Sequence, residues 1–211
     1  MMRIDSVAAQ PDRAGRYTVK FENGTAMRLY RQTVEDFGLY TGKELTEDEL
    51  KNLKISAGQM SAKMRAVRIV SASSVSKGEL ERRLVQKGEK KSDAMDAVAW
   101  MTELNLLDDQ KTAEAIVHRC IAKGYGLARA KQALYEKRIP KEFWADALAD
   151  YPDQTEKILE FLHSRLGNGW EEKDLRRATD ALLRRGHSYQ EIRAALQEFS
   201  DNADFQEDIY G

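Results

Sequence analysis

Cysteine, proline and long apolar runs are scarce in this chain, and each shortage excludes something. Cys120 is the one cysteine among 211 residues, so no disulfide can form within the chain, which fits a reducing compartment. Its helical context favours a buried, inert thiol over a nucleophile. No apolar run of about 18 residues and no signal-peptide pattern occur, so we expect no membrane association and a cytoplasmic location. Three prolines, Pro11, Pro140 and Pro152, stand where connections between elements are expected.

A strong net charge is also lacking. The 34 basic side chains almost cancel the 35 acidic ones, so bulk charge gives no argument for nucleic acid or membrane as a partner. The distribution is less even, because the last residues, 201–211, contain acidic side chains and no basic ones. We expect this acidic tail to be disordered and to compete with anionic partners.

Groupings of side chains typical of catalysis or metal binding are missing as well. His118, His163 and His187 have no cysteine or carboxylate at metal-ligand spacing, which argues against zinc. The glycines around Tyr125 lack the Gly-Lys-Ser/Thr ending of a phosphate loop and follow a helix rather than a strand. Asp108 and Asp109 fit a helix cap better than a metal pair. We therefore expect no enzyme activity, no cofactor and no metal.

The first 55 residues have a different apolar pattern from the rest of the chain. Alternating apolar residues in 16–22, followed by Asn23-Gly24 and the strand-like segment 25–30, predict a β-hairpin with a type I′ turn. Two short helices are expected over 34–37 and 46–53, the second opened by a capping box of Thr46 and Glu49. An isolated hairpin is marginal in water, so these elements should pack together as a small N-terminal segment.

From about residue 59 the apolar period is that of a helix, and one segment recurs three times. The copies are 76–88, 126–139 and 171–186. Aligning Leu84, Leu134 and Leu182 brings a basic residue into register three positions later in each copy, and the copies lie 50 and 48 residues apart. Such a period predicts tandem helical units, each too small to bury its apolar face alone.

These patterns predict a mainly α protein: three tandem three-helix repeats, similar to helix-turn-helix units, in an elongated array after a small N-terminal segment that contains the β-hairpin. The expected division is an N-terminal segment 1–55, a first repeat 56–107, a second repeat 108–151, a third repeat 152–200 and the acidic tail 201–211. An array of this kind presents a long surface suited to following another polymer.

The short segments that open and close the repeats resemble those of the RecX family of bacterial regulators of the RecA recombinase. The matching stretches are 76–88, the Leu-Leu-Asp-Asp step at 106–109, Lys-Gly-Tyr-Gly-Leu-Ala-Arg-Ala-Lys-Gln-Ala-Leu at 123–134, and 137–140. Family members usually have glycine where this chain has Arg138, a position that a left-handed helix cap favours for glycine. They also usually have phenylalanine near Thr112.

This resemblance implies a regulator without enzymatic activity. It would bind RecA or the RecA filament on single-stranded DNA and regulate, mainly by inhibition, ATP hydrolysis, strand exchange and coprotease activity in recombination and the SOS response. RecA and its nucleoprotein filament are the expected partners, single-stranded DNA is a further candidate, and a monomer is expected. The alternative is a helix-turn-helix-type protein that binds DNA independently of RecA, which predicts tight, salt-dependent binding to naked DNA.

Basic residues recur on the second helix of each repeat, and we call them the basic stripe. A single one is more often a solvated charge, but their recurrence in three repeats favours contact with phosphates or with acidic patches on a protein filament. Tyr125 could stack on a base or fill a gap between repeats, and we expect it to fill the gap. Trp100, Trp144 and Trp170 are expected to be core or inter-repeat anchors rather than base-stacking platforms. The basic stripe comprises Lys77, Arg82, Arg83, Lys87, Lys123, Arg129, Lys131, Lys137, Arg138, Lys173, Arg176, Arg177, Arg184 and Arg185.

Overall fold

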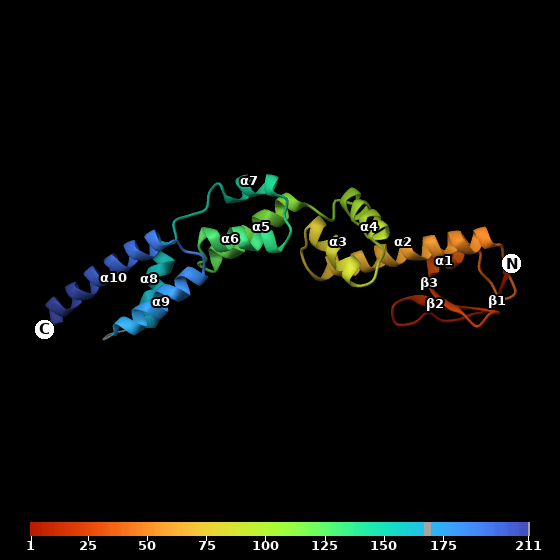
Figure 1. The fold of residues 1–211 in the computed structure, drawn as a ribbon, viewed down its shortest axis with the longest axis horizontal. Helices are drawn as coiled ribbons and strands as arrows, with labels where there is room; N and C mark the ends of the chain where they lie inside the picture. Colours follow the sequence, from red (N-terminus) through yellow and green to blue (C-terminus); the bar gives the residue numbers. More distant parts are fainter. Residues whose placement is uncertain (167–169, 211) are drawn as a thin grey trace. The chain divides into compact units, whose positions relative to one another are not determined.

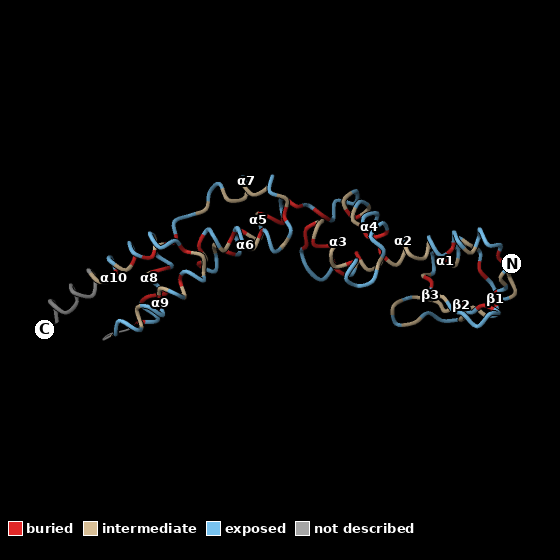
Figure 2. Tube along the Cα trace, in the orientation of Figure 1, coloured by how far each residue is buried: buried red, intermediate tan, exposed pale blue. Residues whose placement is uncertain are grey.

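The computed structural model describes the backbone of residues 1–166 and 170–210 and, within these ranges, the side chains up to residue 200. The predicted connection over 167–169 lies outside the described residues. The chain forms two compact units, Met1–Leu107 and Asp108–Gly211. Figure 1 labels most of the elements along the chain, and Figure 2 marks the buried residues within each group of helices.

The first unit begins with a four-stranded antiparallel sheet in the order β3-β2-β1-β4. The hairpin β2–β3 confirms the sequence prediction, but its turn differs from type I′. Only Gly24 takes a positive φ, of 79°, and the amide of Phe21 donates to the carbonyl of Thr25 at 2.9 Å across a three-residue loop. Strands β1 and β4, which the sequence analysis missed, complete the sheet. The strands are β1 (Met2–Val7), β2 (Arg16–Phe21), β3 (Ala26–Tyr30) and β4 (Glu44–Leu45).

The short helix expected over 46–53 is instead the start of one long helix. After α1 (Arg31–Asp36), α2 (Glu47–Ala72) continues for 26 residues. The predicted capping box is present: Thr46 Oγ1 accepts from the amide of Glu49 at 3.2 Å, and a Glu49 carboxylate oxygen accepts from the amide of Thr46 at 2.7 Å. No proline or capping signal interrupts the sequence before Ser73, so α2 passes through residue 55, where the sequence had placed a boundary.

The two halves of α2 belong to different cores. Leu53 lies in the core under the sheet, whereas Ala62, Ala66 and Ile69 lie in the core of the first repeat. Ala62 and Ala66 are fully buried there. The first repeat is completed by α3 (Lys77–Gln86) and α4 (Lys91–Glu103).

The second unit contains the other two repeats, which confirms the predicted tandem of three-helix units. Cys120 is buried on α5, as predicted, and burial raises the pKa of its thiol. The third helix of the second repeat is short and is preceded by a 3-10 turn. The helices are α5 (Asp109–Ala122), α6 (Leu127–Glu136), η1 (Lys141–Phe143) and α7 (Trp144–Leu148), then α8 (Thr155–Leu166), α9 (Glu172–Arg184) and α10 (Tyr189–Tyr210).

Helix α10 extends beyond the boundary predicted for the third repeat. The acidic residues 201–210, which we expected to form a disordered tail, continue it as helical backbone. Glu191, Ile192 and the residues that follow have the apolar period of a helix, and neither proline nor glycine interrupts it before Gly211.

Candidate partner-binding surface

The second helices of the three repeats end with the same backbone geometry. The carbonyls of Leu84, Leu134 and Leu182 each accept from the amide five residues later, at 3.1, 3.0 and 3.3 Å. In each case the residue before that donor has a positive φ: 91° at Gly88, 54° at Arg138 and 87° at Gly186. These are Schellman caps. The register predicted from the three leucines is therefore the structural register, and Lys87, Lys137 and Arg185 occupy equivalent positions.

Arg138 is the departure that the sequence predicted. A non-glycine side chain in the left-handed region costs about 1 kcal/mol, because its Cβ crowds the neighbouring carbonyl. The side chain of Arg138 is exposed. The strain is therefore confined to the backbone of this cap.

In the first repeat, two arginines of the basic stripe already bind a buried carboxylate on the same helix. The carboxylate of Glu79, which is 2% exposed, accepts from Arg82 Nε at 2.8 Å and from Arg83 Nε at 2.7 Å. These hydrogen bonds, above all the one from Arg82, lower the pKa of Glu79 to about 2. Lys77 is half-buried and Lys87 is exposed. Arg82 and Arg83 thus already compensate a buried charge.

In the second repeat the basic residues surround the ends of α6. Arg129 pairs with Glu136 at 3.1 Å, and Lys131 and Arg138 are exposed while Lys137 is half-buried. Lys123, at the end of α5, lies 6.0 Å from the ring centre of Tyr125. The stripe of this repeat is therefore divided between the start of α6, near Arg129, and its end, near Arg138.

In the third repeat the stripe runs the length of α9. Three of its residues are in exposed ion pairs: Lys173 with Glu171 at 2.7 Å, Arg176 with Glu172 at 2.7 Å, and Arg177 with Asp174 at 3.5 Å. Exposed pairs of this kind contribute little to stability and exchange readily for another anion. Arg184 is exposed and Arg185 is half-buried at the end of the helix.

The end of α9 is bonded directly to the start of α6. The amide of Gly126 donates to the carbonyl of Arg185 at 2.9 Å, and the amide of Ala128 donates to the carbonyl of Gly186 at 3.2 Å. Amides at a helix start and carbonyls at a helix end are the groups without partners inside their own helix. Gly126 has no side chain to cap α6, so the third repeat caps the second with its backbone.

His187 completes this junction. Its Nε2 lies 3.0 Å from the carbonyl of Gly124, so it carries the proton and donates. Its Nδ1 is buried without a hydrogen-bond partner among the described residues. Burial lowers the pKa of His187 below its ordinary value, an effect opposed by the bond to Gly124 and by Glu191. The imidazole is therefore neutral at pH 7, and its buried ring packs where the second and third repeats meet.

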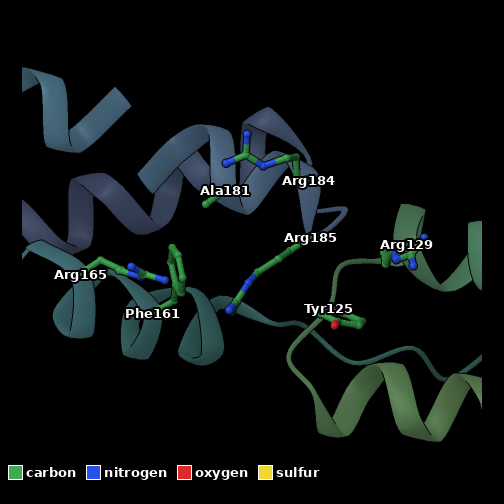
Figure 3. A pocket seen from close by; sticks show the side chains of 7 residues that line it. All are labelled: Tyr125, Arg129, Phe161, Arg165, Ala181, Arg184 and Arg185. Atoms are coloured by element: carbon green, nitrogen blue, oxygen red, sulfur yellow. The ribbon is translucent and has the colours of Figure 1, made fainter. Parts of the chain in front are cut away.

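A cavity of about 300 Å³ opens beside the junction, and we call it the arginine cavity. Figure 3 shows Phe161 between Arg165 and Arg185, with Arg184 above them and Tyr125 and Arg129 on the side of the second repeat. The guanidinium carbons of Arg165 and Arg185 lie 5.6 and 4.2 Å from the centre of the Phe161 ring. The lining residues are Tyr125, Arg129, Phe161, Arg165, Ala181, Arg184 and Arg185.

The sequence analysis found Arg129, Arg184 and Arg185 but missed Arg165 and Phe161. Both residues lie on α8, the first helix of the third repeat, whereas the basic pattern recurs on the second helices. Their separation of four residues was the available signal, because it places them on one face of a helix.

The three tryptophans lie close to their predicted places, whereas Tyr125, which was expected to fill a gap between repeats, borders a cavity. Trp100, Trp144 and Trp170 are partly buried against the cores of the first, second and third repeats. Tyr125 is half-buried, and its carbonyl accepts from the hydroxyl of Tyr151 at 2.7 Å, which ties the connection between α5 and α6 to the end of the second repeat. The ring of Tyr125 also lines the arginine cavity.

Metal-binding side chains do not gather in the part of the chain whose side chains the structure describes. Within residues 1–166 and 170–200, no three side chains of His, Cys, Asp or Glu are placed to hold an ion. Asp108 instead caps α5, as predicted, and accepts from the amide of Lys111 at 3.0 Å. None of the helices in the described part of the chain is long and apolar enough to span a membrane.

Comparison with known proteins places this fold in a family. The model of "RecX, second three-helix domain" matches residues 108–148. A Regulatory protein RecX from Xanthomonas oryzae pv. oryzae (strain MAFF 311018) is 31% identical over 136 residues, which cover 63% of this chain and 85% of that relative. This chain belongs to the RecX family. Regulatory protein RecX from Vibrio parahaemolyticus serotype O3:K6 is 28% identical over 146 residues, 68% of this chain and 94% of its own.

Solved RecX structures share the fold. A crystal structure of regulatory protein RecX superposes with a TM-score of 0.62 at 20% identity, covering 95% of this chain and all of the other. RecX from Lactobacillus salivarius gives a TM-score of 0.57 at 23% identity, covering 69% and 98%. The chain thus has the fold of the RecX regulators. Phe161, Arg165, Arg184 and Arg185 lie outside the segment matched by the family model.

Proposed function

We propose that this protein regulates homologous recombination and the SOS response by binding RecA, or the RecA filament on single-stranded DNA, and mainly inhibiting it. Membership of the RecX family is the observation that carries the proposal. The inhibited activities would be ATP hydrolysis, strand exchange and coprotease action. The protein would act in the cytoplasm as a monomer.

The repeated helix caps supply the physical basis. A filament presents the same surface at regular intervals, and a chain with basic residues at equivalent places in successive repeats can address several of these surfaces at once. Exposed arginines on α9, whose carboxylate partners are also exposed, are available to acidic patches or phosphates of such a polymer. The basic stripe as a whole is therefore the proposed contact surface.

The test is the rate of ATP hydrolysis by RecA on single-stranded DNA as the purified chain is titrated in. We expect the rate to fall progressively and to be suppressed by an excess of the chain. The control is an unrelated ATPase that moves along single-stranded DNA, which should be unaffected. An unchanged RecA rate at stoichiometric excess contradicts the proposal.

Equal inhibition of both ATPases would instead support the second candidate function, a DNA-binding protein that acts without RecA by covering the strand. That candidate requires strong affinity for naked DNA which falls steeply with salt. The nearly balanced charge of the chain, 34 basic against 35 acidic side chains, weighs against it.

A further inference from the structure

We propose that the arginine cavity binds a nucleotide unit, that is, a phosphate ester together with its base. This inference goes beyond the proposed function and relies on it only for the setting in which a single strand is encountered. A strand of DNA and a free nucleotide share this chemistry, and the experiment distinguishes them.

Uncompensated positive charge is the first argument. Four arginines line the cavity, and among the described residues that line it there is no carboxylate. Arg129 pairs with Glu136, but both side chains are more than a third exposed, at 39% and 48%, so an incoming anion can replace this partner. Several guanidinium groups around one hollow suit a phosphate, because the planar fork of donors matches its oxygens.

The orientation of the guanidinium groups is the second argument. Arg165 and Arg185 lie on the ring of Phe161, which is 8% exposed and held in the core of the third repeat. A guanidinium stacked on an aromatic face keeps the donors at its edge free. Phe161 therefore holds two cations in place before any ligand arrives, which reduces the entropy lost on binding.

The second repeat adds an aromatic surface to this cluster of charges. The half-buried ring of Tyr125 lines the cavity on the side opposite Phe161 (Figure 3). Hydrogen bonds between Gly126 and Arg185 and between Ala128 and Gly186 fix the two repeats at this point. A flat ring beside a group of arginines is the combination by which proteins hold single strands, through stacking of a base and contact with its phosphate.

Size and continuity favour a nucleotide over a carboxylate of a protein partner. A cavity of about 300 Å³ is of the size of small-ligand sites, and a carboxylate would fill little of it. A second hollow, of about 310 Å³, shares Phe161 and Arg185 with the first and adds Lys123, Lys157 and Glu160. Lys157 pairs with Glu160 at 2.8 Å, and both side chains are exposed, so an incoming phosphate can replace this carboxylate. Two adjoining hollows can then hold successive phosphates, so the strand is the source that the surface favours.

The test compares two double variants of the full chain. Arg165→Gln with Arg184→Gln removes two cavity charges, and Arg119→Gln with Arg193→Gln removes two exposed charges of the second unit that belong neither to the cavity nor to the basic stripe. Binding of a fluorescein-labelled short oligothymidylate is measured by anisotropy over a range of salt concentrations. The cavity variant should bind on the order of tenfold or more weaker, with a salt slope smaller by about 1.4 for two lost phosphate contacts, and the control should bind nearly as the native chain.

Tyr125→Leu tests the stacking half of the site. It should weaken oligothymidylate binding on the order of tenfold, leave binding of an abasic strand unchanged, and be rescued by Tyr125→Phe. Thymidine monophosphate is the competitor that separates the two sources. If thymidine monophosphate displaces the labelled strand at a single site, the cavity binds one nucleotide by itself. If only an unlabelled strand displaces it, binding also needs the adjoining hollow. Either result supports the site.

Three results would overturn the inference. If the cavity variant binds the oligonucleotide as tightly as the native chain, the cavity is not the binding site. If both double variants lose affinity equally, the chain binds the oligonucleotide through its general positive charge. Retained oligonucleotide binding together with lost binding to RecA without DNA would assign the cavity to an acidic protein segment. Failure to inhibit the RecA ATPase would refute the proposed function alone, because the oligonucleotide assay contains no RecA.

Discussion

Gly126 and Gly186 meet backbone to backbone where the second and third repeats join. A Cβ atom on Gly126 would lie 2.1 Å from the carbonyl oxygen of Gly186, and a Cβ on Gly186 would lie 2.3 Å from the amide nitrogen of Arg129. A rotamer change cannot relieve either clash, because the atoms met are backbone atoms and the Cβ of Arg129. These two glycines thus set how closely α6 and α9 approach.

Gly126→Ala should separate the two repeats. The added methyl group forces the carbonyls of Arg185 and Gly186 away from the start of α6, at a cost of about 2–3 kcal/mol to the second unit. Hydrogen exchange measured by mass spectrometry should show faster exchange at 124–130 and 184–190, and little change in the first unit. The matched control is Gly88→Ala, where nothing lies within 4 Å, so only the cost of a positive φ, about 1 kcal/mol, should appear. Native-like protection of the junction in Gly126→Ala would show that the contact does not hold the repeats together.

Arg138→Gly should stabilise the second repeat. The substitution removes the strain of a positive φ at the cap of α6, and after the greater freedom of glycine in the unfolded chain the net gain should be about 0.5 kcal/mol. Chemical denaturation followed by tryptophan fluorescence gives the midpoint. Arg138→Ala is the control: it removes the same charge but keeps the strain, so its midpoint should stay near that of the native chain. If both variants shift equally, charge and not the backbone is the cause.

Glu79→Gln should loosen the first repeat. The neutral amide leaves Arg82 and Arg83 without their buried anion, at a cost of about 2–3 kcal/mol. Because its pKa is lowered from 4.5 to about 2 in the folded chain, the native carboxylate contributes fully above about pH 4.5 and loses this contribution as pH falls toward 2. Amide exchange at α3 between pH 5 and 3 should therefore accelerate in the native chain beyond the intrinsic pH trend and much less in the variant. Glu81→Gln, on the same helix, is the control for a general change of charge.

His187 should make the junction of the second unit sensitive to mild acid. Its pKa is lowered from 6.5 in the folded state, so the unfolded chain binds a proton first and stability falls as pH drops below 6.5 until the folded pKa is reached. His187→Gln retains a donor for the carbonyl of Gly124 but does not titrate. Melting at pH 7.5 and 5.5 should show a larger drop for the native chain than for the variant, with exposed His118→Gln behaving like the native chain. Equal drops in the native chain and His187→Gln would contradict this assignment.

Local signals predicted most of the architecture. The three aligned leucines predicted the register of the repeated caps. Thr46 and Asp108 each marked the start of a helix, and the Asn23-Gly24 pair marked the hairpin. Each of these features rests on contacts between near neighbours in the chain. What could not be predicted depends on partners distant in sequence. Strand β1 pairs with β2 and β4, and short edge segments such as β4 have no pattern of their own.

The candidate site shows the same division. Arg184 and Arg185 were identified because they repeat, but Phe161 and Arg165 reach the cavity through the packing of α8 against α9. The contact of Gly126 with Gly186 joins residues sixty positions apart, and their sequence context predicts only a turn for each. Likewise, Arg82 and Arg83 bind the carboxylate of Glu79. Composition does not reveal that this carboxylate is buried.

Helix α2 restricts how sequences of this kind can vary in length. One continuous helix carries Leu53 into the core under the sheet and Ala62 and Ala66 into the core of the first repeat. Each residue inserted between them would turn the second set by about 100° relative to the first, so one or two added residues would point one set of side chains at solvent. An insertion of about seven residues, close to two full turns, would restore the facing directions. Length changes between 54 and 61 should therefore be tolerated only in such steps, whereas the loops before Arg16 and after Phe37 are free of this constraint.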